Sequence, residues 1–359
     1  MFLYALIACS SDNSLHKIED ADGAYDTASW NEDDTGSSGN DTAVPDGYDA
    51  GVKGRICDPS GGSWVSGALV WVSVDENQDG TSDYRRETLT DGDGRFTLTG
   101  LPSGTHTVHV EKGSFTHEFD VTLQGGMYEM TDPECIPPDD VKIAVVTGSY
   151  DSIEKVLDRM GLEYDLFSGE FDWSGESEGI KLLKNPNQMG QYDIIFLNCG
   201  MDDSWTWSEG PTIGKNLKNY VVDGGSVYAS DWAYFAFEVA FPDALTFYGS
   251  DANPGAAYAG NEGYLTANVL DSGMQVVLGK NTAELNYDLG AWAVAESAKG
   301  DVDVLLEGNA SLYLGGSVNK SPLAAYVQPN GRFVYTSFHN EPQTTGDMDK
   351  MLKEIILSL

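Results

Sequence analysis

The second half of the chain, from about residue 141, alternates apolar runs with amphipathic segments. Apolar runs predict strands over 141–147, 193–198, 226–229 and 333–338, and apolar spacing predicts helices over 152–160, 212–222 and 347–357, with another starting at 232. Strands that are apolar along their whole length suit a parallel sheet that is covered on both faces. Alternation of strands and helices through short links is typical of such a sheet. The pattern therefore predicts an α/β domain over residues 141–359, with a β-rich insertion at about 262–330.

The preceding segment, residues 51–132, has a different hydrophobic pattern. Apolar and polar residues alternate over 68–74, 95–98, 106–110 and 117–123, and turns rich in Gly and Asp separate these runs. Short alternating strands at close spacing are typical of a small β-sandwich. A Pro-rich hinge over 133–140 follows. The expected fold class is therefore multidomain, with a small all-β sandwich followed by a flavodoxin-like α/β domain.

Four segments of the β-rich part carry a family resemblance. They are VKGRI at 52–56, SGALV at 66–70, TDGDGRF at 90–96 and LPSGT at 101–105. Together they resemble the carboxypeptidase regulatory-like domain, a prealbumin-like β-sandwich. The resemblance implies a structural or adhesive module without catalytic residues.

One loop of this domain has the residue types of a calcium site. Oxygen-bearing side chains recur at alternate positions, and Gly80 permits a sharp turn between them; the residues are Asp75, Asn77, Asp79, Thr81 and Asp83. Hard cations take such oxygen ligands. The closing acid of an EF-hand would fall on Arg86, so the loop is not a full EF-hand. The alternatives are a stabilising calcium site and an ordinary acidic hairpin turn.

The N-terminus resembles a lipoprotein leader. Residues 1–8 are apolar, and Leu6-Ile7-Ala8-Cys9 resembles the lipobox of bacterial lipoproteins. The resemblance implies cleavage before Cys9, lipidation of Cys9 with palmitate among the acyl chains, and, from Ser10, an outer-membrane address on the periplasmic or external face. No Lys or Arg precedes Cys9, which a start codon farther upstream or a chance match would explain.

Residues 10–50 hold eleven acidic residues and one Lys, with many Ser, Gly and Thr. Such a segment cannot bury enough apolar area to offset its ordering entropy, so it is expected to be a disordered tether. The whole chain carries 57 acidic and 20 basic residues, a net charge of −37. That charge argues against nucleic acid as a partner and against simple adsorption to anionic lipid. Attachment to a membrane is therefore expected to occur through the lipid anchor.

The remaining cysteines predict one disulfide and one thiol. Cys57 and Cys135 flank the β-rich domain. An oxidising compartment would favour a bond between them. Cys199 is then expected to be a single buried thiol.

Three segments of the α/β part resemble the class I glutamine amidotransferase-like fold, particularly its ThuA-like members. They are YDIIFLNCG at 192–200, GGSVYASDW at 224–232 and TSFHNE at 336–341. The resemblance implies an oxyanion loop at Asn198, Cys199 and Gly200. It places the nucleophile elbow at Ser230 and Asp231. The family's terminal His and Glu become His339 and Glu341, with Asn340 in place of Pro.

The elbow departs from the family because Asp231 stands where the catalytic Cys is expected. A carboxylate is a poor substitute for a thiolate in amide hydrolysis, so the domain is expected to bind a ligand or partner without amidotransferase activity. Two alternatives remain: a hydrolase that uses Ser230 or Asp231 with His339 and Glu341, and a purely structural envelope protein. Cys199 is a further candidate nucleophile. Asp231, His339 and Glu341 could also hold a metal.

Aromatic residues cluster in sequence near these segments, namely Trp205, Trp207, Trp232 and Tyr234. Aromatic walls with nearby acids suit a polyol or sugar ligand; the acids are Asp202, Asp203, Asp231 and Glu341. The alternative is that these rings fill a small core of their own.

Overall fold

The computed structural model of the chain describes residues 48–359 except 78, 140, 172, 174, 250–254 and 341–343. The expectations for Cys9, for most of the acidic linker, for the Trp207 side chain and for Glu341 lie outside the described residues. In this described part, no helix has the length and apolar character needed to cross a membrane.

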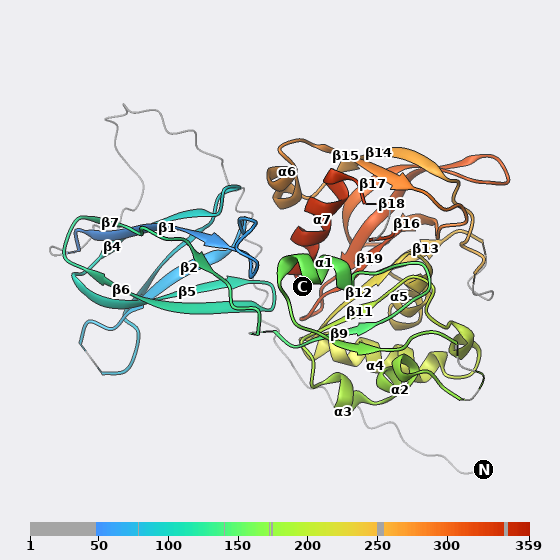
Figure 1. The fold of residues 1–359 in the computed structure, drawn as a ribbon, viewed down its shortest axis with the longest axis horizontal. Helices are drawn as coiled ribbons and strands as arrows, with labels where there is room; N and C mark the ends of the chain where they lie inside the picture. The colour runs from blue at the N-terminus through green and yellow to red at the C-terminus, as the bar shows by residue number, and fades with distance from the viewer. Residues whose placement is uncertain are drawn as a thin grey trace, which may run out of the picture. The chain divides into compact units, whose positions relative to one another are not determined.

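The β-rich domain is a sandwich of two small sheets (Figure 1). One sheet has the order β4-β1-β7, with β8 also paired to β1, and the other has the order β3-β2-β5-β6. The strands are β1 (Ala50–Cys57), β2 (Leu69–Val74), β3 (Tyr84–Leu89), β4 (Arg95–Leu101), β5 (Gly104–Lys112), β6 (Phe115–Leu123), β7 (Met127–Glu129) and β8 (Glu134–Cys135). In β4 the side chains alternate between buried and exposed, as expected for a strand that covers a core on one face.

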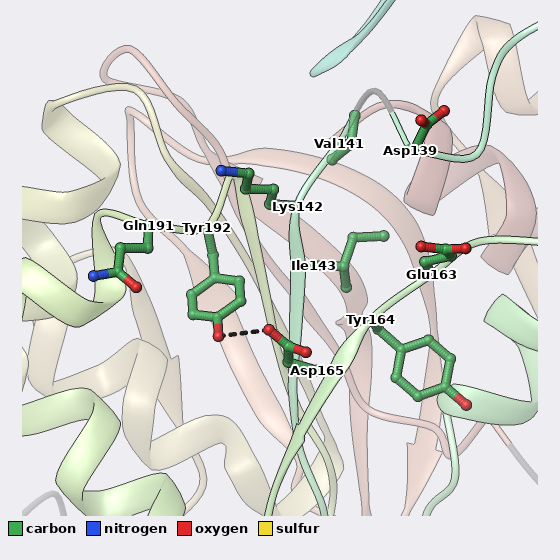
Figure 2. Close-up of a pocket in the computed structure, with 9 residues that line it drawn as sticks. All are labelled: Asp139, Val141, Lys142, Ile143, Glu163, Tyr164, Asp165, Gln191 and Tyr192. Atoms are coloured by element: carbon green, nitrogen blue, oxygen red, sulfur yellow. Dashed lines mark hydrogen bonds between the residues drawn. The ribbon is translucent and has the colours of Figure 1, made fainter.

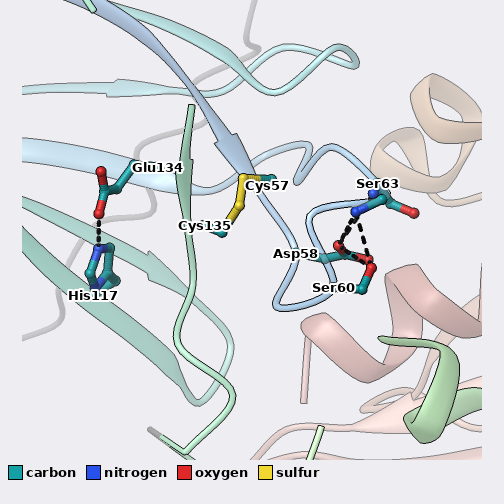
Figure 3. Close-up of a disulfide and its surroundings, with 8 residues drawn as sticks. Cys57, Asp58, Ser60, Ser63, His117, Glu134 and Cys135 are labelled. Carbon is teal, nitrogen blue, oxygen red and sulfur yellow. Dashed lines mark hydrogen bonds and ion pairs between the residues drawn. A yellow bond between two sulfur atoms is a disulfide. The ribbon is translucent and has the colours of Figure 1, made fainter. Parts of the chain in front are cut away.

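A disulfide joins Cys57 to Cys135 at the edge of this sandwich, as expected (Figure 3). The two residues are direct neighbours in the parallel pairing of β1 with β8. Their Cα atoms lie 4.3 Å apart although 78 positions separate them in sequence. Beside the bond, His117 Nε2 lies 2.8 Å from Glu134 Oε1, which also links β8 to β6. The bond therefore fastens the first strand of the domain to its last.

The α/β domain contains one nine-stranded mixed sheet of order β10-β9-β11-β12-β19-β18-β17-β14-β15. Its parallel part consists of β10 (Asp165–Phe167), β9 (Ile143–Val146), β11 (Ile194–Leu197), β12 (Ser226–Ser230) and β19 (Phe333–Thr336). Its antiparallel part consists of β18 (Ser317–Val327), β17 (Asp303–Ser311), β14 (Gly263–Val269) and β15 (Thr282–Tyr287). The insertion therefore extends the main sheet. A separate two-stranded sheet pairs β13 (Leu245–Phe247) with β16 (Ala295–Ala298).

Helices cover both faces of the parallel strands (Figure 1). Successive side chains of β9 are all buried and alternate between two cores. One core includes residues of α1 (Glu154–Met160) and α7 (Gly346–Leu357), and the other includes residues of α2 (Glu178–Lys184), α4 (Gly210–Val222) and α5 (Tyr234–Ala240). This burial on both faces explains why these strands are apolar throughout.

Some elements were not expected from the sequence. Strand β10, helix α2 and the short helix α3 (Pro186–Met189) occupy the stretch between the first two expected strands, and α6 (Ser272–Leu278) lies within the β-rich insertion. β10 has only three residues, two of them exposed, so it carries no hydrophobic pattern. Helix α6 buries only Met274 and Leu278, which is too few apolar positions for a clear helical period.

Candidate functional site

The carboxyl ends of three neighbouring parallel strands bring the candidate residues together. Cys199 follows β11, Asp231 follows β12, and His339 lies three residues beyond β19. β12 pairs with both β11 and β19, so these ends lie at one edge of the sheet. This edge is where open α/β sheets build their sites.

The turn after β12 has a strained backbone. Asp231 has φ of 43°, a left-handed conformation that non-Gly residues seldom adopt. Such strain costs about 1–3 kcal/mol and persists where the surroundings hold it. Here Asp231 Oδ1 accepts a hydrogen bond from the N–H of Ala293 at 2.6 Å, and Asp231 Oδ2 lies 2.7 Å from His339 Nε2. Both carboxylate oxygens are therefore engaged.

His339 is the partner of this carboxylate, and only 4% of its surface is exposed. Its Nε2 atom also lies 3.1 Å from the Sγ atom of Cys199. Burial lowers the pKa of His339. The hydrogen bond and the charge of Asp231 oppose this effect, and the net shift of the pKa is upward from 6.5. The raised pKa favours the protonated imidazole of His339, which lies in hydrogen-bond contact with the Asp231 carboxylate in a buried place.

Replacing Asp231 by Asn is expected to lower the pKa of His339. Asn retains a hydrogen-bonding side chain but removes a negative charge that favours the protonated imidazole. In the wild type the raised pKa stabilises the fold below pH 6.5, and this contribution is lost as the pH rises through the folded-state pKa. Each tenfold increase in the proton affinity of His339 on folding adds about 1.4 kcal/mol to the free energy of unfolding at low pH.

The measurement is a pH titration of the His339 ring signals by NMR in the presence of a chelator. His339→Gln assigns the signal, because the other four histidines are retained. An unchanged pKa in Asp231→Asn would contradict the ion pair.

Cys199 lies in the loop that follows β11. Burial raises the pKa of its thiol well above the usual range, and the charge of Asp231 raises it further. The thiol is therefore protonated at neutral pH and is a weak nucleophile. Its backbone N–H donates to Ser230 Oγ at 3.0 Å, so in this structure that N–H is not free to stabilise an oxyanion.

The rest of this loop is held tightly. The side-chain amide of Asn198 donates to Glu154 Oε2 at 3.0 Å. Gly200 has φ of 84°, and a Cβ atom there would lie 2.6 Å from the Tyr150 ring, so only Gly fits this position.

Ser230 belongs to a second buried network that is organised by Asp151. The Ser230 hydroxyl donates to Asp151 Oδ2 at 2.5 Å. Asn340 donates twice to the same carboxylate, through its backbone N–H at 2.9 Å and its side-chain amide at 2.6 Å. Pro at position 340 could make neither bond, which gives a physical reason for Asn here. Sequence patterns did not reveal Asp151, because it lies on a loop before α1 with no motif around it.

Two of the four predicted ligand-binding aromatics are core residues instead. Trp205 is buried against Phe235, with ring centroids 5.3 Å apart. Tyr234 is buried against Phe247 at 4.6 Å. Neither ring presents a face to a ligand, so for these two the alternative of a small core applies.

Trp232 has a different setting. Its ring stacks on Tyr258 with centroids 4.4 Å apart, and it meets Tyr150 edge-on at 5.1 Å. Tyr150 is 45% exposed, and the Tyr258 hydroxyl donates to Asp203 Oδ2 at 3.5 Å. We call Tyr150, Trp232, Tyr258 and Asp203 the aromatic face. It lies beside the turn that carries Asp231.

The acidic loop of the β-rich domain folds around its own backbone. Asp75 Oδ2 accepts from the N–H of Gly80 at 2.8 Å, and Asp79 Oδ1 accepts from the N–H of Thr81 at 2.8 Å. Asn77 Oδ1 accepts from the N–H of Asp79 at 2.9 Å, and Asp83 Oδ2 accepts from the N–H of Glu76 at 2.7 Å. Among the described residues, the acids of this loop do not bring three ligand atoms within 4.8 Å of one another.

A calcium titration separates the two alternatives for this loop. If the loop binds calcium, millimolar calcium raises the melting temperature of the β-rich domain, and Asp79→Ala removes the rise. Calorimetric melting with and without calcium measures this. If calcium raises the melting temperature of Asp79→Ala as much as that of the wild type, or does not raise that of the wild type, the loop is an ordinary acidic turn.

A surface cavity of about 380 Å³ lies at the opposite edge of the sheet (Figure 2). It is lined by residues at the amino ends of β9 and β10, and within it the Tyr192 hydroxyl donates to Asp165 Oδ2 at 2.9 Å. None of the candidate catalytic residues lines it.

Comparison with known proteins identifies the first domain. Residues 51–131 match the family model of the carboxypeptidase regulatory-like domain. The β-rich domain is a carboxypeptidase regulatory-like domain. This confirms the resemblance drawn from its sequence segments. The curated proteins contain no match to the chain.

Solved structures similar to the chain include amidotransferase-like proteins. A putative GMP synthase protein from Thermoplasma acidophilum is 13% identical, with a TM-score of 0.41 over 61% of this chain and 94% of the other. A glutamine amidotransferase from Thermotoga maritima is 8% identical, with a TM-score of 0.36 over 59% and 81%. A cytoplasmic protein from Salmonella typhimurium is 12% identical, with a TM-score of 0.37 over 59% and 98%. Similarity at this level says nothing about activity.

Proposed function

We propose that this chain is an envelope lipoprotein whose amidotransferase-like domain binds a ligand without amidotransferase activity. The main observation behind this proposal is that Asp231 occupies the position expected for the nucleophile. Its two carboxylate oxygens contact the Ala293 N–H and His339 Nε2. Amide hydrolysis through an acyl-enzyme needs a nucleophile at this point.

The neighbouring side chains do not replace the missing nucleophile. The Ser230 hydroxyl is bonded to Asp151, and His339 is bonded to Asp231. The Cys199 thiol contacts His339, but burial and the adjacent carboxylate keep it protonated. A hydrolase based on Ser230 would need both networks to rearrange.

The envelope location is supported by the lipobox-like residues before Cys9 and by the disulfide of the first domain. Disulfides persist in oxidising compartments outside the cytoplasm. The acidic segment 10–50 would then separate the lipid anchor from the folded domains.

The aromatic face supports a sugar or polyol as the ligand class. A partly exposed stack of Trp232, Tyr258 and Tyr150 beside the Asp203 carboxylate combines a flat apolar surface with a hydrogen-bond acceptor. Melting of the purified chain over a panel of neutral and amino sugars tests this.

A ligand raises the melting temperature of the wild type, and Trp232→Ala removes the rise. Tyr264→Ala is the matched control, since Tyr264 is 72% exposed and is not part of the aromatic face. No shift with any sugar, or an equal shift in Trp232→Ala, would contradict the ligand class.

Mass spectrometry of the native protein tests the lipid anchor. The mature N-terminal peptide is expected to begin at Cys9 with added acyl mass, and Cys9→Ser is expected to release the protein from the membrane fraction. An unmodified Cys9 in the membrane-extracted protein would contradict the lipoprotein assignment.

A further inference from the structure

A buried cluster of three metal-ligating side chains lies at the carboxyl edge of the parallel strands. The atoms are Cys199 Sγ, Asp231 Oδ2 and His339 Nε2, and all lie within 4.8 Å of one another. The exposed fractions of the three residues are 1%, 1% and 4%. From this geometry we propose that Cys199, Asp231 and His339 bind one divalent transition metal, with zinc as the best fit.

The S···O distance is close to that of a tetrahedral ion, whereas the two distances to His339 Nε2 are shorter and must lengthen when a metal binds. Zinc bonded to S, N and O at its usual lengths holds these ligand atoms about 3.4–3.6 Å apart. In this structure the S···O distance is 3.7 Å, the N···S distance is 3.1 Å and the N···O distance is 2.7 Å. The shortest distance is that of a hydrogen bond between His339 and Asp231. Loss of that proton on metal binding lets the two atoms separate by about 0.7 Å.

The charges also suit a divalent cation. A thiolate and a carboxylate together neutralise two positive charges, and a neutral imidazole adds no further charge. The metal would therefore be bound as a neutral unit in a buried place, where uncompensated charge is costly. Without a metal, the same groups must retain protons to limit their charge.

The donor set selects the type of metal. Calcium and magnesium take oxygen ligands, whereas thiolate and imidazole favour zinc and neighbouring transition metals. Asp231 is also oriented for this role, because the Ala293 N–H holds Oδ1 and turns Oδ2 toward the cluster. Three protein ligands leave a fourth position for water or a small ligand.

Cobalt(II) substitution tests the site in the full chain carrying Cys9→Ser, so that Cys199 is the free thiol that remains. The chelator-treated protein is titrated with cobalt alone and then with zinc. The expected result is one cobalt per chain with a thiolate-to-cobalt charge-transfer band, displaced by zinc, and a rise in melting temperature of about 5–10 °C at a hundredfold excess over the dissociation constant.

Variants assign the ligands. Cys199→Ser is expected to abolish the charge-transfer band, and His339→Gln is expected to weaken zinc binding about 100-fold or more. His109→Gln, a histidine of the β-rich domain, should bind as the wild type does. Circular dichroism of the metal-free variants checks their folding, and zinc content after growth in zinc-supplemented medium gives an independent readout. No band in the wild type, or a band that persists in Cys199→Ser, would overturn the proposal.

Discussion

Asp151→Ala is expected to destabilise the α/β domain by about 3–5 kcal/mol. The carboxylate is 3% exposed and accepts hydrogen bonds from the Ser230 hydroxyl, from both donors of Asn340 and from the Ser152 N–H. Its removal leaves these donors unpaired in a buried place, and each unpaired donor costs about 1–3 kcal/mol. The change also removes the connection between the segment after β19, which carries Asn340, and the last residue of β12, Ser230.

Chemical denaturation followed by tryptophan fluorescence and by circular dichroism measures this loss. Asp165→Ala is the matched control, because that exposed carboxylate accepts one hydrogen bond from the Tyr192 hydroxyl. The control is expected to change the free energy of unfolding by less than about 1 kcal/mol. Equal effects of the two variants would contradict the central role of Asp151.

Replacing Cys57 and Cys135 together by Ala is expected to destabilise the β-rich domain by about 4 kcal/mol. The bond closes a loop of 78 positions, and the chain-entropy model assigns about this value to a loop of that length. The loss corresponds to a fall in melting temperature of about 20 °C for a domain of this size. The bond matters here because the domain is small and buries a limited core.

Calorimetry of the oxidised wild type, the reduced wild type and the double variant measures the effect. The reduced wild type should melt close to the double variant, and reductant should leave the double variant unchanged. A double variant that melts within about 2 °C of the oxidised wild type would show that strand pairing alone holds β1 to β8.

The sequence predicted the main architecture because the relevant patterns are local. Four-residue strands such as β9 and β11 are buried at every position, and their apolar runs stand out from the polar segments around them. The four motifs of the β-rich domain were likewise sufficient to identify its family. Short elements such as β10 were missed because edge strands bury few side chains.

The site was only partly predictable, because its contacts join segments far apart in sequence. The family resemblance pointed to Asp231 and His339, which lie 2.7 Å apart across the site. It did not predict that the Cys199 sulfur would lie 3.1 Å from the same imidazole, since that depends on how the loop after β11 turns. It also gave no sign of Asp151, whose partners come from two other parts of the chain.

The central claim is that the turn after β12 holds a carboxylate where an acyl-transferring enzyme needs a nucleophile. Intact-mass analysis of the chelator-treated chain after incubation with an electrophilic diazoketone analogue of glutamine tests this claim most directly. Asp231→Cys combined with Cys199→Ser is the positive control, since it places a thiol at the elbow beside His339. The wild type is predicted to gain no covalent mass while this control is labelled. A stoichiometric adduct on wild-type Ser230, Asp231 or Cys199 would contradict the account.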